Sequence, residues 1–427
     1  MSERLAIIGA GHVGLVYAAS FAELGHHVSV LDIDRERVKE LQGGTVPFFE
    51  PGLSDLLKKN VAARRLTFST SPATALKGAR IVFICVPTPS AMEGGLDDGP
   101  MRRALQTVYG MARDGKPIVV TKSTVSVGMH RFITELFHDR PVPVVSNPEF
   151  LREGHAIEDF LHPTRIVLGA DDAEAAAAVA ALYAGIEAPV IMTDPVTAEL
   201  SKLASNAFLA LKISFANTVA RVAATNGASI AETLRILGTD PRIGPGHLRA
   251  GLGFGGACLP KDLAAMEHLA RRSAAPYELF AAAQAVNRDQ RRHVLDVLIA
   301  KMQTLPGRRV AVLGITFKGD TDDLRESPSL ALVADLLEAR MSVVVHDPVA
   351  KLPAAAGSLR AEQRKTVLEA AAGADALVIA TEWKEYSRLP LREVRRAMAG
   401  KILIDGRGML DPGAARKAGF DYVAVGS

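Results

Sequence analysis

The stretch Leu5-Ala-Ile-Ile-Gly9-Ala-Gly11-His12-Val13-Gly14 decides the fold of this 427-residue chain. Its short apolar run predicts a buried strand, and the three glycines are spaced as in the turn between the first strand and first helix of a doubly wound α/β sheet. Glycines at these positions permit a tight turn, close approach of a diphosphate to the backbone, and close packing of the helix on the strand. The stretch therefore predicts a dinucleotide-binding domain.

Asp32 ends the next predicted strand. A carboxylate there can accept hydrogen bonds from an adenosine ribose and would repel a 2′-phosphate, which favours NAD over NADP. Arg35 and Arg37 favour the opposite choice, because a guanidinium could hold that phosphate. We give the aspartate more weight and predict NAD as the cofactor.

Short apolar runs alternate with helix-length segments in the first part of the chain, which is typical of a parallel sheet covered by helices on both faces. The predicted strands are Leu5–Ile8, Val28–Leu31, Ile81–Val86, Ile118–Thr121, Val142–Val145 and Ile166–Leu168. From about residue 194 to residue 300 only helical periodicity is present. After Pro306-Gly307 the alternation returns, with strands at Arg309–Leu313, Ser342–His346, Ala376–Ala380 and Ile402–Ile404.

These patterns predict an α/β protein in which two Rossmann-like parallel-sheet domains are joined by a helical central domain. The expected boundaries are 1–195, 196–302 and 303–427. Three domains agree with a length prior of about 150 residues per domain.

Composition excludes several classes of protein. Fifty lysines and arginines against 47 aspartates and glutamates give a net charge of +3, too little for a nucleic-acid coat or a polybasic membrane binder. The start of the chain lacks a signal-peptide pattern, and no uncharged apolar window reaches the ~18 residues of a membrane span. The two cysteines stand in unrelated contexts, which argues against disulfides. We expect a soluble cytoplasmic protein with no nucleic-acid or membrane partner.

The two cysteines call for different interpretations. Cys85 lies in an apolar strand, where a thiol acts as a small hydrophobic residue. Cys258 follows the glycine-rich loop Gly251-Leu-Gly-Phe-Gly-Gly-Ala and precedes a Lys-Asp pair. Glycines permit close approach to a ligand, and a nearby ammonium favours the thiolate. Beside a nicotinamide, a thiolate indicates aldehyde chemistry: it adds to the carbonyl, the adduct loses a hydride, and a thioester remains to be hydrolysed.

Thioester hydrolysis needs a base, and Pro148–Gly154 supplies Glu149 and Glu153. Four positions apart, they would lie on one face of a short helix; the alternative is a solvated acidic pair at a helix start. Lys202 and Asn206 are one helical turn apart on an otherwise apolar segment and could both face one oxyanion, although helical lysines are usually exposed.

Taken together, these motifs resemble the nucleotide-sugar dehydrogenases, most closely the UDP-glucose 6-dehydrogenase group. The resemblance spans nearly the whole chain. It is carried by Gly9–Gly14, Phe49-Glu50-Pro51-Gly52, Val86–Pro89, Lys122-Ser123-Thr124, Asn147–Gly154, Glu199–Phe208, Arg242-Ile243-Gly244, Gly253–Asp262, Gly314–Ser327, Asp347-Pro348, Thr381-Glu382-Trp383 and Asp405-Gly406-Arg407.

The resemblance implies a four-electron oxidation of a sugar C6 alcohol to a carboxylate, with two NAD⁺ used in succession at one site. The implied catalytic residues are Cys258 as thiolate, Lys202 and Asn206 at the oxyanion, and Thr124, Glu149 and Asp262 for the water and proton transfers. The implied cofactor contacts are Gly9, Gly11, His12, Val13, Gly14, Asp32, Arg37, Val86, Pro87, Thr88, Ser123, Thr124, Glu153 and Arg325.

The implied substrate contacts are Glu149, Phe150, Leu151, Arg152, Lys202, Asn206, Arg242, Arg249, Phe254, Gly255, Lys318 and Arg407. Arg242 matches an arginine that in the family reaches the neighbouring subunit's substrate, which implies a homodimer or a higher homo-oligomer. The C-terminal sheet domain begins with a strand followed by Gly314-Ile-Thr-Phe-Lys318. This turn lacks the three-glycine pattern, so it fits a nucleoside diphosphate better than a second dinucleotide. We find no candidate metal ligands.

Other interpretations stay open at this point. Ser126, Leu259 and the loop Ala91–Gly95 depart from the expected family pattern, so a GDP-mannose 6-dehydrogenase is an alternative. A two-electron hydroxyacid dehydrogenase shares the domain order and the helical Lys and Asn, but has no use for Cys258. A non-catalytic NAD-binding protein with the same fold is a third alternative.

Overall fold

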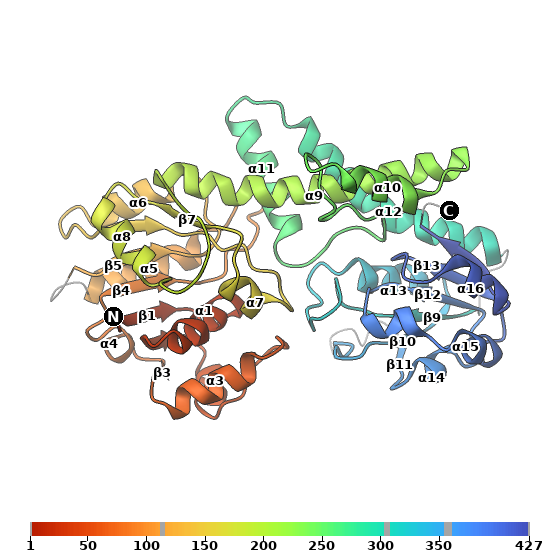
Figure 1. Cartoon of the computed structure of the whole chain (residues 1–427), viewed down its shortest axis with the longest axis horizontal. Helices are drawn as coiled ribbons and strands as arrows, with labels where there is room; N and C mark the ends of the chain where they lie inside the picture. The colour runs from red at the N-terminus through yellow and green to blue at the C-terminus, as the bar shows by residue number, and fades with distance from the viewer. Residues whose placement is uncertain (1, 112–115, 303–307, 354–360, 426–427) are drawn as a thin grey trace. The chain divides into compact units, whose positions relative to one another are not determined.

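The computed structural model describes residues 2–111, 116–302, 308–353 and 361–425. The chain divides into two compact units, Met1–Ser205 and Asn206–Ser427. The division falls inside helix α9 (Pro195–Asn226), the long yellow-green helix in Figure 1, so Lys202 belongs to the first unit and Asn206 to the second. The three predicted domain boundaries stay a prediction.

The first unit is built on an eight-stranded sheet of order β3-β2-β1-β4-β5-β6-β7-β8. The order reverses between β1 and β4, and ligands of open α/β sheets bind at such a switch point. The elements are β1 (Arg4–Ile8), α1 (His12–Glu23), β2 (His27–Leu31), α2 (Arg35–Gln42), α3 (Leu53–Ala62), β3 (Leu66–Ser69), α4 (Pro72–Ala75), β4 (Ile81–Ile84), α5 (Gly99–Met111), β5 (Ile118–Thr121), α6 (Met129–Leu136), β6 (Val144–Ser146), α7 (Ala156–Leu161), β7 (Ile166–Gly169), α8 (Ala173–Ala181) and β8 (Val190–Thr193).

Alternate side chains of the central strands pack on opposite faces of this sheet. Leu5 and Ile7 of β1 point into a core that includes residues of α1, α3, α7 and α8. Ala6 and Ile8 point into a second core, which α5 and α6 cover. A strand buried on both faces must be apolar throughout, which is why these strands read as continuous apolar runs in the sequence.

One strand pair departs from the parallel arrangement that the sequence predicts. β6 and β7 pair antiparallel through Ser146 and Gly169, whereas the other paired strands of the sheet are parallel. The connection between them carries only the six-residue helix α7, and an antiparallel neighbour needs no long crossover helix. The sequence analysis also missed β3 and β8, which are short.

Four helices follow the first sheet: α9, α10 (Ile230–Thr239), α11 (Leu259–Arg272) and α12 (Glu278–Met302). Among the described residues, α9 alone is long and apolar enough to cross a membrane by length and composition, a test that core helices also pass. Its Glu199 is buried and accepts hydrogen bonds from the backbone N–H groups of Gly128 (2.7 Å) and His130 (2.9 Å). The first turns of α9 are therefore bound to the start of α6.

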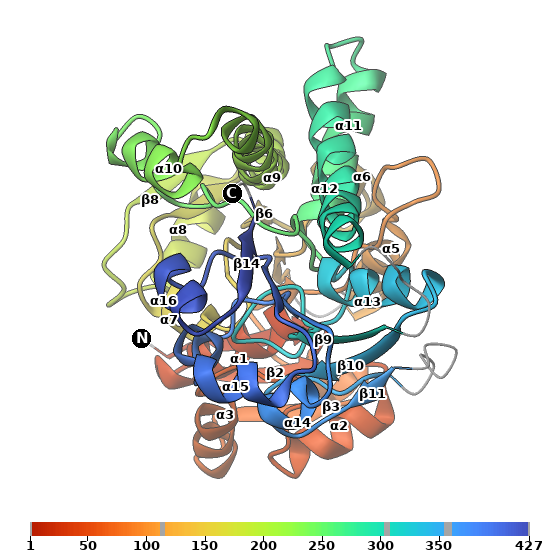
Figure 2. The same ribbon diagram turned by 90° about the vertical axis from the view of Figure 1, so that its right-hand side faces the viewer.

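The second unit contains a six-stranded parallel sheet of order β11-β10-β9-β12-β13-β14. Figure 2 shows it in blue, with α14 and α15 on one side and α13 on the other. The elements are β9 (Arg309–Leu313), α13 (Pro328–Glu338), β10 (Ser342–His346), β11 (Glu362–Gln363), α14 (Val367–Ala371), β12 (Ala376–Ile379), the 3₁₀ helix η2 (Lys384–Arg388), α15 (Leu391–Ala397), β13 (Ile402–Asp405), α16 (Pro412–Lys417) and β14 (Asp421–Ala424).

The two sheets share a structural repeat that the sequence did not reveal. The second sheet repeats the order of β3-β2-β1-β4-β5-β6 strand for strand. Gly9 and Gly314 follow the equivalent strands, both with positive φ (104° and 89°). The sequence analysis missed β11 and β14, the two edge strands of the second sheet.

Candidate active site

The three glycines after β1 meet different surroundings. A Cβ on Gly9 would lie 2.4 Å from the carbonyl oxygen of Cys85, and one on Gly14 would lie 1.9 Å from that of Gly9. A Cβ on Gly11 would meet nothing within 4 Å. Gly9 and Gly14 therefore allow close packing of backbone, while Gly11 faces open space at the N-terminus of α1. This cradle fits the diphosphate of NAD, the cofactor that would accept the hydride.

The Asp32 carboxylate stands beside this cradle, buried at the end of β2. Its oxygens accept hydrogen bonds from the backbone N–H groups of Ala10 (2.7 Å) and Asp34 (2.9 Å). The Arg37 guanidinium lies 3.6 Å from Asp32 and 3.8 Å from Asp34, so carboxylates neutralise it. This charge balance fits a ribose hydroxyl pair better than a 2′-phosphate.

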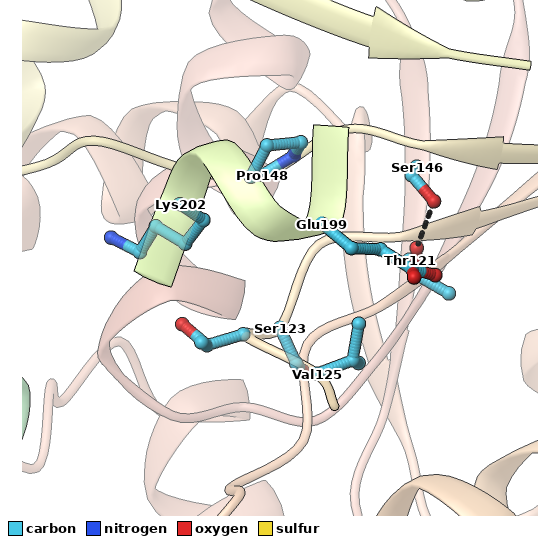
Figure 3. Close-up of a pocket in the computed structure, with 8 residues that line it drawn as sticks. Thr121, Ser123, Val125, Ser146, Pro148, Glu199 and Lys202 are labelled. Atoms are coloured by element: carbon cyan, nitrogen blue, oxygen red, sulfur yellow. Dashed lines mark hydrogen bonds between the residues drawn. The ribbon is translucent and has the colours of Figure 1, made fainter. Parts of the chain in front are cut away.

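Two further loops with predicted cofactor contacts meet after β4 and β5. The Ser123 hydroxyl donates to the carbonyl of Val86 (2.7 Å), which joins Val86-Pro87-Thr88 to Ser123-Thr124. Figure 3 shows the small pocket at this place, to which α9 contributes Glu199 and Lys202. The complete lining is Thr121, Ser123, Thr124, Val125, Ser146, Pro148, Glu199 and Lys202. Arg325 belongs to the second unit and pairs there with Asp323 at 2.5 Å.

The short helix expected for Pro148–Gly154 is wrong. Residues 147–152 form no helix, and α7 begins at Ala156. The Glu149 carboxylate turns back to accept the N–H of Leu151 at 2.7 Å, a local bond that competes with helical hydrogen bonding. Glu149 and Glu153 therefore do not share a helix face.

Glu149 forms a buried ion pair with Lys202, at 2.9 Å between Oε1 and Nζ, and both side chains are more than 90% buried. Burial opposes ionisation of Glu149, but the charge and hydrogen bond of Lys202, the N–H of Leu151 and the charge of Lys122 outweigh it and lower the pKa of Glu149. Glu149 is thus a carboxylate at neutral pH, able to accept a proton. Lys202 also lies 5.4 Å from the centre of the Phe150 ring.

Lys122 is a buried cation to which the sequence analysis gave no role. Its Nζ, with 1% of the residue exposed, donates to Oδ1 of Asn147 (2.9 Å) and lies 4.0 Å from the centre of the Tyr17 ring. Burial lowers the pKa of Lys122 to about 7. The signal in the sequence was a lysine directly after the apolar strand Ile118–Thr121. Behind it Cys85 is buried, and burial raises the pKa of its thiol to about 12, as expected of an inert cysteine.

Cys258 is exposed and precedes the first residue of α11. The N-terminal end of a helix favours a thiolate. In the first turn, the buried Asp262 carboxylate accepts hydrogen bonds from Nδ2 of Asn206 (2.6 Å) and Nζ of Lys261 (2.5 Å). The second unit thus places Asn206 against Asp262, and Lys261 pairs with that carboxylate.

The glycines of the cysteine loop contact protein closely. A Cβ on Gly255 would lie 2.1 Å from the carbonyl oxygen of Glu326, and one on Gly256 would lie 2.7 Å from the Phe317 ring. Gly253, with φ +107°, leaves no space beside Asn287. These glycines therefore let the loop before Cys258 pack tightly on its neighbours within the second unit, and the loop's own Phe254 is buried.

The predicted substrate residues are divided between the units. Arg152 pairs with Asp159 at 2.6 Å and Arg242 with Asp240 at 2.5 Å. The Arg407 guanidinium donates to the carbonyl oxygens of Ala380 (2.6 Å), Phe317 (3.3 Å) and Gly253 (3.4 Å). Leu151 and Phe150 flank Glu149 in the first unit, whereas Arg249, Phe254, Gly255 and Lys318 lie in the second.

The dinucleotide cradle of the first unit and the exposed thiol of the second define the class of a nicotinamide-dependent oxidoreductase. Within the described ranges, no cluster of three or more His, Cys, Asp or Glu side chains could hold a metal ion. Residues 3–187, 196–289 and 311–412 match, in turn, the NAD binding, central and UDP binding domains of the UDP-glucose/GDP-mannose dehydrogenase family. The chain belongs to this family.

Similar proteins cover the whole chain. The UDP-glucose 6-dehydrogenase TuaD of Bacillus subtilis is 37% identical over 99% of this chain and 93% of its own length. A UDP-glucose 6-dehydrogenase of Rhizobium meliloti is 40% identical over 99% of both chains. The structure of a UDP-glucose dehydrogenase from the archaeon Pyrobaculum islandicum superposes with a TM-score of 0.92 at 36% identity, covering 100% of this chain and 98% of that one. The predicted family, fold class and NAD cofactor are confirmed.

Replacing Lys202 by Met should destabilise the protein, because Glu149 would stay buried without its cation. Removal of one partner of a buried pair costs about 3–5 kcal/mol, which denaturant unfolding at pH 7 would measure. Because the folded-state pKa of Glu149 is lowered, the pair stabilises fully above the unfolded value of about 4.3 and its contribution is lost as the pH falls through the folded value. The difference in unfolding free energy between the wild-type protein and K202M should therefore become smaller at acidic pH.

Lys59→Met is the matched control, because Lys59 forms an exposed pair with Glu23. A surface pair contributes only about 0–1 kcal/mol. If K202M were as stable as K59M at pH 7, the buried pair would not carry the stability assigned to it.

The wild-type protein should prefer NAD⁺ to NADP⁺ in kcat/KM, since a 2′-phosphate facing Asp32 would place like charges together at a cost of several kcal/mol. Asp32→Ala should narrow the preference by releasing Arg37. Asp34→Ala removes the other carboxylate beside Arg37 but keeps Asp32, so it should change the cofactor preference less than Asp32→Ala does. A wild-type preference for NADP⁺ would instead assign Arg35 or Arg37 to the phosphate.

Proposed function

We propose that this protein oxidises the C6 hydroxyl of UDP-glucose to the carboxylate of UDP-glucuronate, with two NAD⁺ consumed per sugar. The observation that carries the proposal is the match to a UDP binding domain at residues 311–412 in a chain whose full-length relatives, at 36–40% identity, are named UDP-glucose 6-dehydrogenases. The exposed thiol of Cys258 at the start of α11 supports the four-electron course.

In this proposal the first oxidation would pass a hydride from C6 to the bound NAD⁺ and release the hydroxyl proton to solvent, leaving an aldehyde. The Cys258 thiolate then adds to C6, and a carbon–sulfur bond forms as the carbonyl oxygen becomes an alkoxide. Loss of a second hydride gives a thioester. Water attacks C6, the carbon–sulfur bond breaks, and the thiolate leaves with the carboxylate as product.

Lys202 and Asn206 stabilise the negative charge that develops on the C6 oxygen. The buried ammonium of Lys202 is supported by its 2.9 Å contact with Glu149, and Asn206 is oriented by its 2.6 Å bond to Asp262. Glu149 accepts the proton of the attacking water, with Thr124 and Asp262 orienting that water. Lys202 keeps Glu149 ionised, so the carboxylate is ready to accept a proton when the thioester has formed.

The other sequence-predicted contacts keep the roles proposed for them. The cofactor is held at Gly9–Gly14, Asp32, Arg37, Val86–Thr88, Ser123, Glu153 and Arg325. The nucleotide sugar is held at Phe150, Leu151, Arg152, Arg249, Phe254, Gly255, Lys318 and Arg407, with Arg242 reaching a neighbouring subunit. We place the activity in the cytoplasm, where a reducing environment would keep Cys85 and Cys258 from forming disulfides.

A homodimer through α9 completes the proposal. Phe208, Phe215 and Val222 stand seven residues apart on this helix and are 62%, 51% and 57% exposed. Side chains at this spacing follow one helix face. A row of exposed apolar side chains on a long helix fits a second copy of the same helix, because a symmetric partner presents the same row.

Cys258→Ala should abolish acid formation while leaving the first oxidation possible. The wild-type enzyme should release two NADH per UDP-glucose with little free aldehyde, since the thiolate retains the intermediate. In C258A, an aldehyde-trapping reagent should capture the two-electron product. GDP-mannose, tested in parallel, should be a poor substrate. A wild-type stoichiometry of one, unchanged in C258A, would establish a two-electron dehydrogenase.

Glu149→Gln should block thioester hydrolysis, because an amide keeps the shape of the carboxylate but cannot accept a proton. General-base assistance contributes about 10²–10⁴-fold, so steady-state turnover should fall by that factor. Mixing E149Q with NAD⁺ and UDP-glucose should give a rapid NADH burst and a sugar-nucleotide adduct on Cys258, visible by intact mass. A variant with neither burst nor adduct would show that Glu149 acts before the thioester and leave Asp262 or Glu153 as the base.

Phe215→Glu should shift the assembly toward monomer, because it places a charge in the middle of the α9 row. Light scattering coupled to size-exclusion chromatography measures the mass directly. Leu368→Glu, an exposed apolar residue of α14 outside the row, is the control and should retain the wild-type mass. A wild-type protein that is monomeric at micromolar concentration would contradict the proposal.

A further inference from the structure

Glu50 is a buried carboxylate with no role in the chemistry above. Only 1% of its side chain is exposed. Its two oxygens accept hydrogen bonds from the backbone N–H groups of Gly154 (2.7 Å) and Ala156 (2.8 Å). Ala156 is the first residue of α7, and Gly154 ends the loop that carries Glu149. Glu50 therefore fixes the far end of that loop over a sequence separation of about a hundred residues.

The same carboxylate reaches the cofactor cradle. Oε2 of Glu50 lies 2.8 Å from Nε2 of His12, and His12 is the first residue of α1, directly after Gly11. The His12 ring stacks on Phe48 with centroids 4.5 Å apart, so residues 48–50 hold the imidazole by its face and by its edge. A single buried side chain thus joins the loop at the dinucleotide position to the loop of the proposed base.

The His12 contact joins Glu50 to the cradle through a side chain. Nε2 of His12 is buried, and the polar atom beside it is Oε2 of Glu50, 2.8 Å away. His12 stands at the start of α1, next to the open space over Gly11 where the diphosphate of NAD would bind. Glu50 therefore fixes the imidazole at the edge of the cofactor cradle.

We propose that Glu50 is a positioning residue that holds His12 toward the dinucleotide diphosphate and, through Gly154 and Ala156, holds the Glu149 loop in register with the cofactor. The inference rests on the proposed function for the role of Glu149, whereas its cofactor half rests on the NAD-binding domain alone. A carboxylate suits the position because it only accepts hydrogen bonds and faces two N–H donors and an imidazole. Anchoring both loops to one rigid group pre-organises them before the cofactor binds.

Glu50→Gln is the direct test. The amide has one accepting oxygen, so its NH₂ group would face a backbone N–H donor, and it lacks the negative charge that the carboxylate presents to the imidazole. Because E50Q would loosen this side of the cradle, the Kd for NAD⁺ should rise about tenfold, which corresponds to about 1.4 kcal/mol. Calorimetric titration of the full-length protein with NAD⁺, without sugar nucleotide, measures this Kd.

Glu158→Gln is the matched control. Like Glu50, Glu158 lies close to a histidine: its Oε2 is 3.4 Å from Nδ1 of His155. Glu158 belongs to α7, the helix whose first N–H group Glu50 binds, but the Glu158 side chain is 65% exposed. E158Q should bind NAD⁺ with the wild-type Kd. If Glu50 only stabilised the fold, E50Q would unfold at a lower temperature, but the folded variant would bind NAD⁺ with the wild-type Kd. That result would overturn the proposal.

His12→Gln tests the same coupling from the partly exposed side and keeps the measurement possible if E50Q does not fold. H12Q should raise the Kd for NAD⁺. The double variant E50Q/H12Q should bind NAD⁺ no more weakly than the single variant with the higher Kd, because both substitutions break the same interaction. A wild-type Kd in H12Q, or fully additive losses, would overturn the coupling. NAD⁺ affinity that follows these rules in a protein inactive on UDP-glucose would refute the proposed substrate and leave the cofactor role of Glu50 standing.

Discussion

The absence of a side chain at the first residue after β1 is the constraint on which the site depends. At Gly9 the backbone turns with φ +104° and lies so close to Cys85 that a Cβ would be 2.4 Å from its carbonyl oxygen. This close approach lets α1 start beside the neighbouring strand β4, at the point where the strand order reverses. The loops that carry Glu149 and the predicted cofactor contacts of the first unit then emerge at the carboxyl edge of the same sheet, after β1, β2, β4, β5 and β6. Parallel strands make this inevitable, because all of their carboxyl ends lie on one edge.

Charges buried behind that edge give the first unit its chemistry. Lys122, Lys202 and Glu149 are all removed from water, and each affects the others: Lys202 and Lys122 lower the pKa of Glu149, while burial lowers that of Lys122 to about 7. A carboxylate with a lowered pKa is reliably ionised but is a weaker base. The pairing with Lys202 therefore keeps Glu149 ionised but also reduces its strength as a base. In the proposed mechanism, negative charge that develops on the substrate would compete with Glu149 for Lys202, and a carboxylate that is less tightly paired is a stronger base.

Local patterns predicted the class of fold and the NAD cofactor correctly, because each depended on neighbouring residues in the sequence, and the roles of the individual site residues stay predictions. The glycine spacing, Asp32 at a strand end, and a thiol after a glycine loop are all local features. β3 and β8 were missed because neither is a buried apolar run: β3 alternates buried and exposed residues, and β8 is largely exposed, whereas the predicted strands of the first sheet are mostly buried. The Pro148–Gly154 helix failed because the Glu149 side chain satisfies the backbone N–H of Leu151, a bond that no periodicity reveals. Glu50 and Lys122 were quoted within motifs, but their partners lie on distant strands and loops, so their roles needed the structure.

The structural repeat explains why only one of the two sheets suits a dinucleotide. Asp347 occupies the place of Asp32: it accepts the N–H of Ile315 at 2.9 Å, as Asp32 accepts that of Ala10 at 2.7 Å. Yet Asp347 also accepts the N–H groups of Val349, Ala350 and the Trp383 indole, so its oxygens have little capacity left for ribose hydroxyls. Where the first sheet has Gly11 facing open space, the second has the fully buried Thr316, whose carbonyl accepts the Thr381 hydroxyl at 2.7 Å. The second cradle is filled by its own side chains. A ligand of the UDP binding domain must therefore bind without the diphosphate cradle and ribose carboxylate that the first sheet offers to NAD.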